Sequence, residues 1–202
     1  MALLTALTES QGLPGLRADL IQTLLAKYPS AVQTAGQALR KQLNASLEEQ
    51  TLLLEKTLST LPQGDLRRGH EVFMSRKAAC NTCHKLGYGG GTLGPDLTSI
   101  GKARNRRDLL EAILFPSSSI VRGYEPVVVE LAEGRVVGGI ITGESSGEII
   151  LTVDATKQLH IDRTDIAQIL PSAVSPMPNG IATILSPQEL ADLLTFLETG
   201  GR

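Results

Sequence analysis

The two cysteines of this 202-residue chain lie three positions apart and are followed directly by a histidine, as Cys80, Cys83 and His84. On one helical turn, two thiols at this spacing can each add to a vinyl group of a haem and form two thioethers. The adjacent imidazole can then reach the iron as its proximal ligand. The C-x-x-C-H spacing therefore indicates covalent attachment of one haem c through Cys80 and Cys83, with His84 on the metal.

Three other interpretations of these residues stay open. A thioredoxin-like C-x-x-C motif would need a βαβ context, whereas this motif has a helical start before it and a glycine-rich loop after it. A structural zinc site would need four ligands. Only His70 and His160 remain as further histidines, and adjacent Cys83 and His84 would chelate one ion awkwardly. The third interpretation is a chance match in an inert helix, because the motif fixes only three residues.

The residues that follow the motif resemble part of the class I cytochrome c fold. The run Gly94-Pro95-Asp96-Leu97 is similar to the Gly-Pro-x-Leu turn that crosses the proximal side of the haem in that fold. The resemblance implies that the Pro95 carbonyl accepts the Nδ1 proton of His84, and that Pro95 and Leu97 pack on the porphyrin. Basic residues after this turn could pair with the haem propionates, although a solvated charged helix start explains them equally well: Lys102, Arg104 and Arg106.

A low-spin electron carrier needs a sixth iron ligand, and the chain has three methionines. Met1 is terminal, and Met74 lies on an expected helix, where a core position explains it. Met177 lies between two prolines in a loop just before the last helix, which is where class I cytochromes place the distal methionine. We therefore expect Met177 as the distal ligand, with His160 as the alternative.

The elements that must position these residues begin with a helical segment over residues 1–62. Apolar residues from Leu16 onward recur at helical spacing up to Pro29, and capping-box spacings at Ser30 and Ser46 predict two further helices. Three short helices in a row suggest an αα stack that could end a helical repeat array. We interpret this segment as structural.

Residues 63–202 are the expected haem domain, in which capping patterns predict three helices. The first begins at Asp65. The second covers residues 104–115 and is capped near Asn105. The third begins at a Ser186–Glu189 capping box and ends at Gly200. By the cytochrome resemblance, the first and third helices cross. Gly69 would permit their close approach, and Phe73 and Phe196 would fill the contact.

An inserted β module is expected over residues 120–171, between the haem-binding half and the methionine loop. Short β-branched runs there are separated by turn signals at Glu133-Gly134 and Ser146-Gly147. The runs cover residues 127–131, 136–142, 148–153, 158–162 and 166–170. They predict a small antiparallel barrel or curled sheet, which could cover a haem edge, orient Met177, dock a partner or act as a lid without chemistry. The expected fold class is mainly α with a β insertion.

Composition limits the partners and the compartment. Lys and Arg number 19 and Asp and Glu number 21, a formal net charge of −2 that argues against a nucleic-acid partner. No apolar window predicts a transmembrane helix. The N-terminus lacks the basic region of a signal peptide, so the chain is either cytoplasmic or a piece of a longer exported protein. An aromatic share of only 3% follows if a porphyrin supplies flat apolar mass to the core.

The order of all these motifs resembles the Pirellula/Verrucomicrobium-type haem-binding domain over roughly residues 64–199. The motifs are Gly69–Phe73, Cys80–His84, Gly94–Leu97, Leu109–Ser117, Gly123-Tyr124 and Met177–Gly180. In that family the domain usually ends a large exported protein, behind a sugar-dehydrogenase-like β-propeller and helical repeats. The resemblance thus implies a periplasmic or otherwise exported protein, of which residues 1–62 are the tail of the repeat helices.

These patterns together predict an electron-transfer domain rather than an enzyme. It would pass single electrons from an attached or partner dehydrogenase to a redox acceptor. No Ser/His/Asp or paired-carboxylate arrangement indicates substrate chemistry. Two other functions remain as alternatives, a haem-based gas or redox sensor and a docking domain.

Overall fold

The computed structural model describes residues 18–199, so Leu16 and Gly200 of the predicted helices lie outside the described residues. The chain is a mixed α/β protein with 45% helix, which is less helical than the mainly α class that we expected. It divides into two compact units, residues 1–57 and 58–202. Within the described residues, no helix is both long and apolar enough to cross a membrane.

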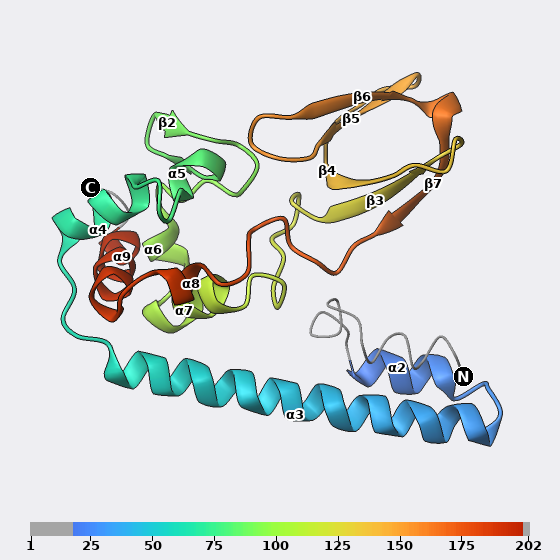
Figure 1. The fold of residues 1–202 in the computed structure, drawn as a ribbon, viewed down its shortest axis with the longest axis horizontal. Coiled ribbons are helices and arrows are strands. Elements are labelled where there is room, and N and C mark those ends of the chain that lie inside the picture. Colours follow the sequence, from blue (N-terminus) through green and yellow to red (C-terminus); the bar gives the residue numbers. More distant parts are fainter. Residues whose placement is uncertain (1–17, 200–202) are drawn as a thin grey trace. The chain divides into compact units, whose positions relative to one another are not determined.

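The first unit contains a helical hairpin of α2 (Ala18–Leu25) and α3 (Ser30–Thr60), whose last turn passes into the second unit (Figure 1). A helix begins at Ser30 as predicted, but the prediction of a further helix from Ser46 is wrong, because α3 runs through Ser46 without a break. A Ser-x-x-Glu spacing caps a helix only where the chain leaves helical geometry. No proline or glycine lies between Gln37 and Thr60 to force that change.

The turn between α2 and α3 is closed by Gln33. Its side-chain amide donates to the Tyr28 carbonyl at 2.7 Å and to the Ala26 carbonyl at 3.2 Å, so it satisfies carbonyls in the turn that follows α2. The helices approach closely at Gly36, where any Cβ would overlap the Leu25 side chain. Gln33 therefore holds the hairpin closed instead of completing the predicted capping box.

The second unit combines short helices with two sheets. The helices are α4 (Leu66–Met74), α5 (Cys80–Cys83), α6 (Ile100–Ala103), α7 (Arg106–Leu114), α8 (Ile181–Ile184) and α9 (Pro187–Thr199). The predicted caps are confirmed: the Asp65 side chain accepts from the Arg68 amide, and Asn105 accepts from the Asp108 amide. The helix predicted over residues 104–115 is shorter than expected. It begins only at Arg106, because Arg104 is extended and separates α6 from α7.

The last helix starts with the capping box that the sequence predicts. The Ser186 amide donates to the Glu189 carboxylate at 2.7 Å, and the Glu189 amide donates to Ser186 Oγ at 3.2 Å. Lys77 also donates to Glu189 at 2.6 Å. That ion pair, followed by the Ser186 amide, lowers the pKa of Glu189 to about 2. The carboxylate therefore stays ionised and links the start of α9 to the segment before the C-x-x-C-H motif.

Helices α4 and α9 lie side by side and form the core of the helical part (Figure 1). A Cβ on Gly69 would overlap the Asp192 carbonyl and lie 2.6 Å from Phe196 Cβ. Phe73 is completely buried, and its ring centroid lies 5.7 Å from that of Phe196. The predicted close crossing at Gly69, filled by Phe73 and Phe196, is confirmed.

A buried carboxylate fastens the same crossing. Asp192 on α9 is 1% exposed, accepts two hydrogen bonds from the Arg68 guanidinium at 2.8 and 2.9 Å, and accepts another from the Asp65 amide at 2.7 Å. The Arg68 hydrogen bond is the main cause that lowers the pKa of Asp192, and burial opposes it. A charged group with all these partners can stay buried, so Asp192 sets the register of α9 on α4.

The inserted module is an open antiparallel sheet whose strands have the order β6-β5-β4-β3-β7. Its strands are β3 (Pro126–Leu131), β4 (Val136–Glu144), β5 (Glu148–Thr152), β6 (Gln158–Asp162) and β7 (Ile166–Pro171). All five predicted strands are confirmed, but the sheet does not close into a barrel, because the edge strands β6 and β7 do not pair.

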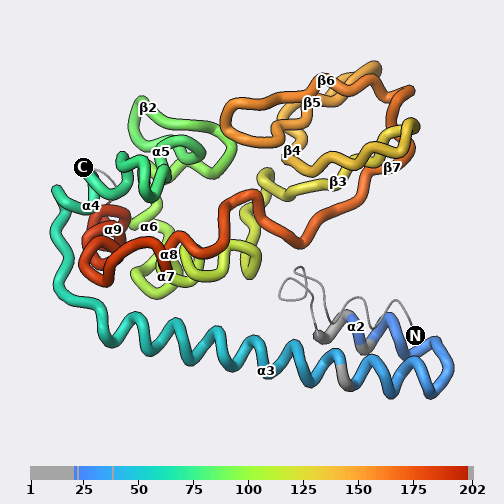
Figure 2. The backbone as a smooth tube through the Cα atoms, in the orientation of Figure 1, coloured from blue at the N-terminus to red at the C-terminus, as the bar shows by residue number. Residues whose placement is uncertain are grey.

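Local chain geometry makes this sheet curl. The edge strands β6 and β7 are joined by a single short 3-10 turn, Arg163–Asp165, so they must converge at one end (Figures 1 and 2). A register shift between Ile141 and Gly143 bends β4 against β5. The concave face is filled by alternating apolar side chains, which are Val129, Leu131, Ile149, Leu151 and Ile161. This core belongs to the module alone, which makes the module a self-contained insertion.

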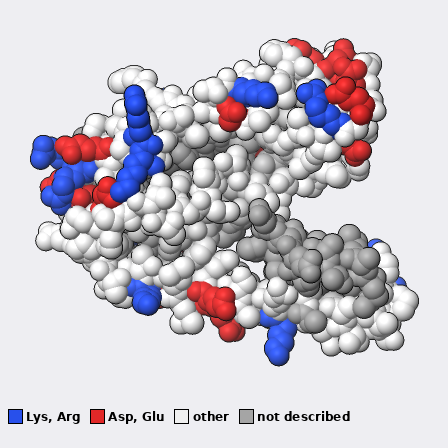
Figure 3. Space-filling view, in the orientation of Figure 1, with Lys and Arg blue, Asp and Glu red and all other residues white. Residues whose placement is uncertain are grey.

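Surface charge is mixed in sign. Figure 3 shows Lys and Arg intermingled with Asp and Glu on the face it presents. Several charged side chains of the described residues are paired, among them Lys77 with Glu189 and Arg163 with Glu144. Exposed pairs of this kind add little stability, but they keep either sign from dominating the surface locally.

The close contact between α4 and α9 makes Gly69 sensitive to an added side chain. We expect Gly69→Ala to lower the free energy of unfolding by about 3 kcal/mol, because the added methyl must push α9 away from α4. Gly147→Ala is the matched control, since a Cβ there meets no atom within 4 Å. Urea unfolding of both variants checks this, and equal stability of the two would contradict the crossing.

Candidate functional site

The C-x-x-C-H motif lies on the single turn of α5 and the residue after it. His84 caps that turn with an extended backbone, and its amide donates to the Cys80 carbonyl at 2.9 Å. Ala79 before the turn has a positive φ of 51°, which is rare for a residue with a Cβ. Both thiols are free and partly buried. The turn therefore presents Cys80, Cys83 and His84 as one compact group.

The His84 ring is held in one tautomer. Its Nδ1 lies 2.9 Å from the Pro95 carbonyl oxygen, as the resemblance implied. A carbonyl only accepts, so Nδ1 carries the proton and Nε2 keeps a free lone pair. Burial lowers the pKa of His84, although the Pro95 hydrogen bond opposes that shift. The imidazole is therefore neutral near pH 7 and can donate its Nε2 lone pair to a metal.

Glycine makes this ring position possible. A Cβ on Gly94 would overlap the His84 ring and lie 2.7 Å from Nδ1. The Gly94 amide also donates to the Cys83 carbonyl at 2.8 Å, which fixes the Gly-Pro turn on the C-x-x-C-H turn. Two residues beyond the proline, Leu97 is half-buried, and its amide donates to the Lys85 carbonyl at 2.8 Å. The Gly-Pro turn is thus hydrogen-bonded to the residues on both sides of His84, Cys83 and Lys85.

A small hairpin that the sequence did not predict lies between the motif and this turn. Strands β1 (Lys85–Leu86) and β2 (Gly89–Gly90) pair antiparallel, with fully exposed Tyr88 at the bend. The next glycine, Gly91, donates its amide to the Asn81 carbonyl at 2.9 Å, and a Cβ there would overlap the Thr82 carbonyl. The glycine-rich run therefore folds the chain back against α5.

The thiols do not have the character of a redox-active disulfide motif. Burial raises the pKa of Cys80 to about 11, and burial followed by the charge of Asp154 raises the pKa of Cys83. Thioredoxin-like sites depend on a lowered thiol pKa. The thioredoxin interpretation also needs a βαβ unit, whereas α5 follows α4 and precedes a two-residue strand. The geometry disfavours that alternative.

The hydrogen bond of Met177 lies within its own loop. The residue is half-buried in the loop between β7 and α8, and its amide donates to Ser175 Oγ at 3.1 Å. The Ser175 amide in turn donates to Ser117 Oγ at 3.0 Å, which ties the loop to the segment after α7. These hydrogen bonds hold the methionine loop in place without joining it to His84.

The other candidates have different surroundings. His160 is on the outer side of β6, 61% exposed, with its Nδ1 3.3 Å from the Glu148 carboxylate. Arg106 donates to Glu198 at 2.6 Å and to the Ala191 carbonyl at 3.3 Å, so it joins α7 to α9. Lys102 and Arg104 are exposed. Of these residues, Arg106 thus has a structural role.

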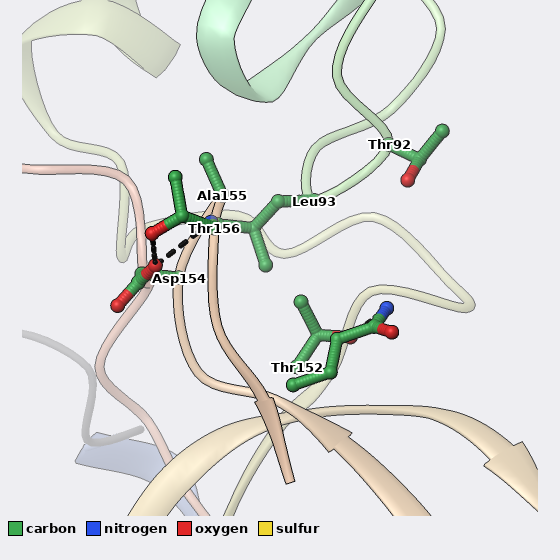
Figure 4. Close-up of a pocket in the computed structure, with 7 residues that line it drawn as sticks. Thr92, Leu93, Thr152, Asp154, Ala155 and Thr156 are labelled. Atoms are coloured by element: carbon green, nitrogen blue, oxygen red, sulfur yellow. Dashed lines mark hydrogen bonds between the residues drawn. The ribbon is translucent and has the colours of Figure 1, made fainter.

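Sequence reasoning missed Asp154, which lines a cavity near the motif. A cavity of about 280 Å³ is lined by Thr92 and Leu93 on one side and by residues of the β5–β6 hairpin, including Asp154 and Thr156, on the other (Figure 4). The Asp-x-Thr pattern signals a tight turn. Nothing in the sequence indicates which part of the chain that turn faces.

Comparison with known proteins adds no relative. No family model matches the chain, and no curated protein matches it. Within the described residues, no group of three or more His, Cys, Asp and Glu side chains is arranged to hold a metal ion. The site must therefore be understood from its own geometry.

The contact between Gly94 and the His84 ring can be tested without any cofactor. We expect Gly94→Ala to raise the pKa of His84 toward its ordinary value, because the methyl displaces the ring from the buried position that lowers it. Titration of the ring protons by NMR measures this, with Gly89→Ala as the control because a Cβ there meets nothing within 4 Å. An unchanged His84 pKa in Gly94→Ala would contradict the contact.

Proposed function

We propose that this chain is a c-type cytochrome domain that binds one haem covalently through Cys80 and Cys83 and transfers single electrons. The observation that carries the proposal is the neutral imidazole of His84, held by the Pro95 carbonyl directly beside two free thiols on the same turn. When bound, the haem supplies one-electron exchange between Fe(III) and Fe(II).

The donor set fits this group. Two free thiols can each add S–H across one vinyl C=C, so that two thioether bonds form without an oxidant, a reductant or a leaving group. His84 has its Nδ1 proton directed at Pro95, which leaves only Nε2 for the iron. The same hydrogen bond makes the imidazole a stronger donor and fixes its plane. Pro95 and Leu97 are half-buried, and the resemblance to class I cytochromes would place both on the porphyrin.

The distal ligand and the partners are proposed from the sequence resemblance. Met177 is the candidate for the sixth position, in a loop fastened through Ser175 and Ser117. A partner or attached dehydrogenase would deliver the electrons, and an exported location would provide the compartment in which the haem is attached. His160 is the weaker choice for the distal position, because its side chain is exposed and pairs with Glu148.

Reversible reduction tests the function itself. The full chain, made with haem c maturation machinery, is expected to give a reversible one-electron midpoint and to resist CO when reduced. We expect His84→Ala to lose this response, because it removes the proximal ligand, and His160→Ala to keep it. Electrochemical titration and CO difference spectra are the measurements. Rapid CO binding by the unaltered reduced protein would contradict the closed carrier and favour a gas sensor.

The distal assignment has its own matched pair of methionines. We expect Met177→Ala to change the reduced absorption spectrum and lower the midpoint potential, since a thioether ligand raises that potential. Met74→Ala is the control, because Met74 is 49% exposed on α4 and is not in the core as we expected. Spectroelectrochemistry of both variants decides the matter. If the Met177 variant keeps the spectrum and midpoint of the parent, another group holds the sixth position.

A further inference from the structure

A hairpin of the inserted β module lies next to the segment that follows the C-x-x-C-H motif. Thr92 and Leu93 line a cavity of about 280 Å³ together with Thr152, Asp154 and Thr156, and the Asp154 carboxylate turns toward Thr156 (Figure 4). Leu93 is 8% exposed, so this wall of the cavity is well covered. The hairpin between β5 and β6 is therefore the part of the module that adjoins the haem-binding half.

The opposite wall is fixed to Cys83 itself. Gly91 lies against the motif so closely that a Cβ on it would be 3.0 Å from Cys83 Cα, and the Gly94 amide donates to the Cys83 carbonyl at 2.8 Å. Thr92 and Leu93 are the two residues between these contacts. The residues that share the cavity with them thus lie next to the segment that contacts Cys83.

Asp154 is exposed to solvent and is fixed in a tight turn by local hydrogen bonds. Its carboxylate accepts hydrogen bonds from the Thr156 amide and the Thr156 hydroxyl, both at 2.8 Å, and the Val153 amide closes the turn on the Lys157 carbonyl at 2.9 Å. The Thr156 amide, followed by its hydroxyl, lowers the pKa of Asp154, so the group is ionised at neutral pH.

We propose that Asp154 is a redox-tuning residue. Its negative charge lies on the Cys83 side of the site and lowers the reduction potential of the haem attached there. The inference rests on the proposed function. On reduction, one electron from the partner converts Fe(III) to Fe(II), and the iron loses one unit of positive charge. A nearby carboxylate stabilises the more positive Fe(III) state and disfavours that step. The inserted module would then set the potential of the domain, besides covering it.

The chain offers a matched control. Asp162 in the same module accepts from the Thr164 amide at 2.8 Å and from the Thr164 hydroxyl at 2.7 Å, which is the same local turn. It precedes the turn between β6 and β7 and does not line the cavity. Asp162→Asn therefore reproduces the change in charge and in turn chemistry at another place. Asparagine can still accept from the threonine amide, so both turns are expected to persist.

The placement of Asp154 can be measured in the apoprotein. In a full chain carrying Cys80→Ala, Cys83 is the single thiol, and its alkylation rates with neutral iodoacetamide and anionic iodoacetate are compared. The ratio of the two rates reports the local electrostatic potential, because the thiolate fraction cancels. We expect Asp154→Asn to increase the iodoacetate rate relative to the iodoacetamide rate about twofold, the size of a screened unit charge several ångströms away. Asp162→Asn is expected to leave the ratio unchanged.

The second measurement uses the haem-loaded full chain with both cysteines. Asp154→Asn is expected to favour reduction about twofold, which corresponds to a midpoint higher by about 18 mV at 59 mV per tenfold for one electron. Asp162→Asn should keep the parent midpoint. Thr156→Ala, which retains the charge but removes one hydrogen bond, should also keep it and shows that the shift does not come from altered turn structure.

The two readouts separate this inference from the function on which it rests. An unchanged alkylation ratio in Asp154→Asn overturns the placement of the charge, whether or not haem is attached. A changed ratio with an unchanged midpoint overturns the redox role. Failure of the unaltered chain to attach haem overturns the proposed function and the redox role with it. The inference is supported if Asp154→Asn changes the alkylation ratio and raises the midpoint, while Asp162→Asn changes neither and Thr156→Ala keeps the parent midpoint.

Discussion

The hydrogen bond from His84 Nδ1 to the Pro95 carbonyl is the interaction on which the rest of the site depends. It joins the turn that carries the two thiols to the Gly-Pro turn, and it decides which ring nitrogen stays available. The bond forms only because Gly94 has no side chain to occupy the space of the imidazole. One glycine and one carbonyl thus determine both the position and the protonation of the candidate ligand.

The helical core holds this arrangement from outside. α4 and α9 cross closely at Gly69, and Asp192 fixes their register through Arg68 and the Asp65 amide. The pairing of Lys77 with Glu189 then connects α9 to the segment that enters the C-x-x-C-H turn. A site made of one short turn gains its rigidity from these contacts, since four helical residues are too few to be stable alone.

Local signals in the sequence predicted much of this molecule. The caps at Asp65, Asn105 and Ser186 and all five strands of the module depend on neighbouring residues, which is why they could be read from the chain. The continuous α3 was missed because a serine at a capping spacing looks the same inside a helix as at its start. The strand order, with β7 beside β3, depends on how the sheet curls, and no local pattern encodes that.

The candidate site shows the same division. The thiols, the histidine and the Gly-Pro turn are close in sequence, and the structure brings them together as a group. Asp154 lies far along the chain and comes near Cys83 only because the module folds its hairpin toward Thr92 and Leu93. Its charge acts across space, so neither its residue type nor its turn motif could indicate the role that we propose.

Covalent haem attachment is the claim that one measurement tests most directly. The full chain is made with haem c maturation machinery and denatured, and its absorption spectrum and intact mass are recorded. The account predicts one haem that remains bound after denaturation, and a chain carrying both Cys80→Ala and Cys83→Ala that retains none. A denatured chain without a haem band, from cells that attach haem to a control cytochrome, would contradict the account.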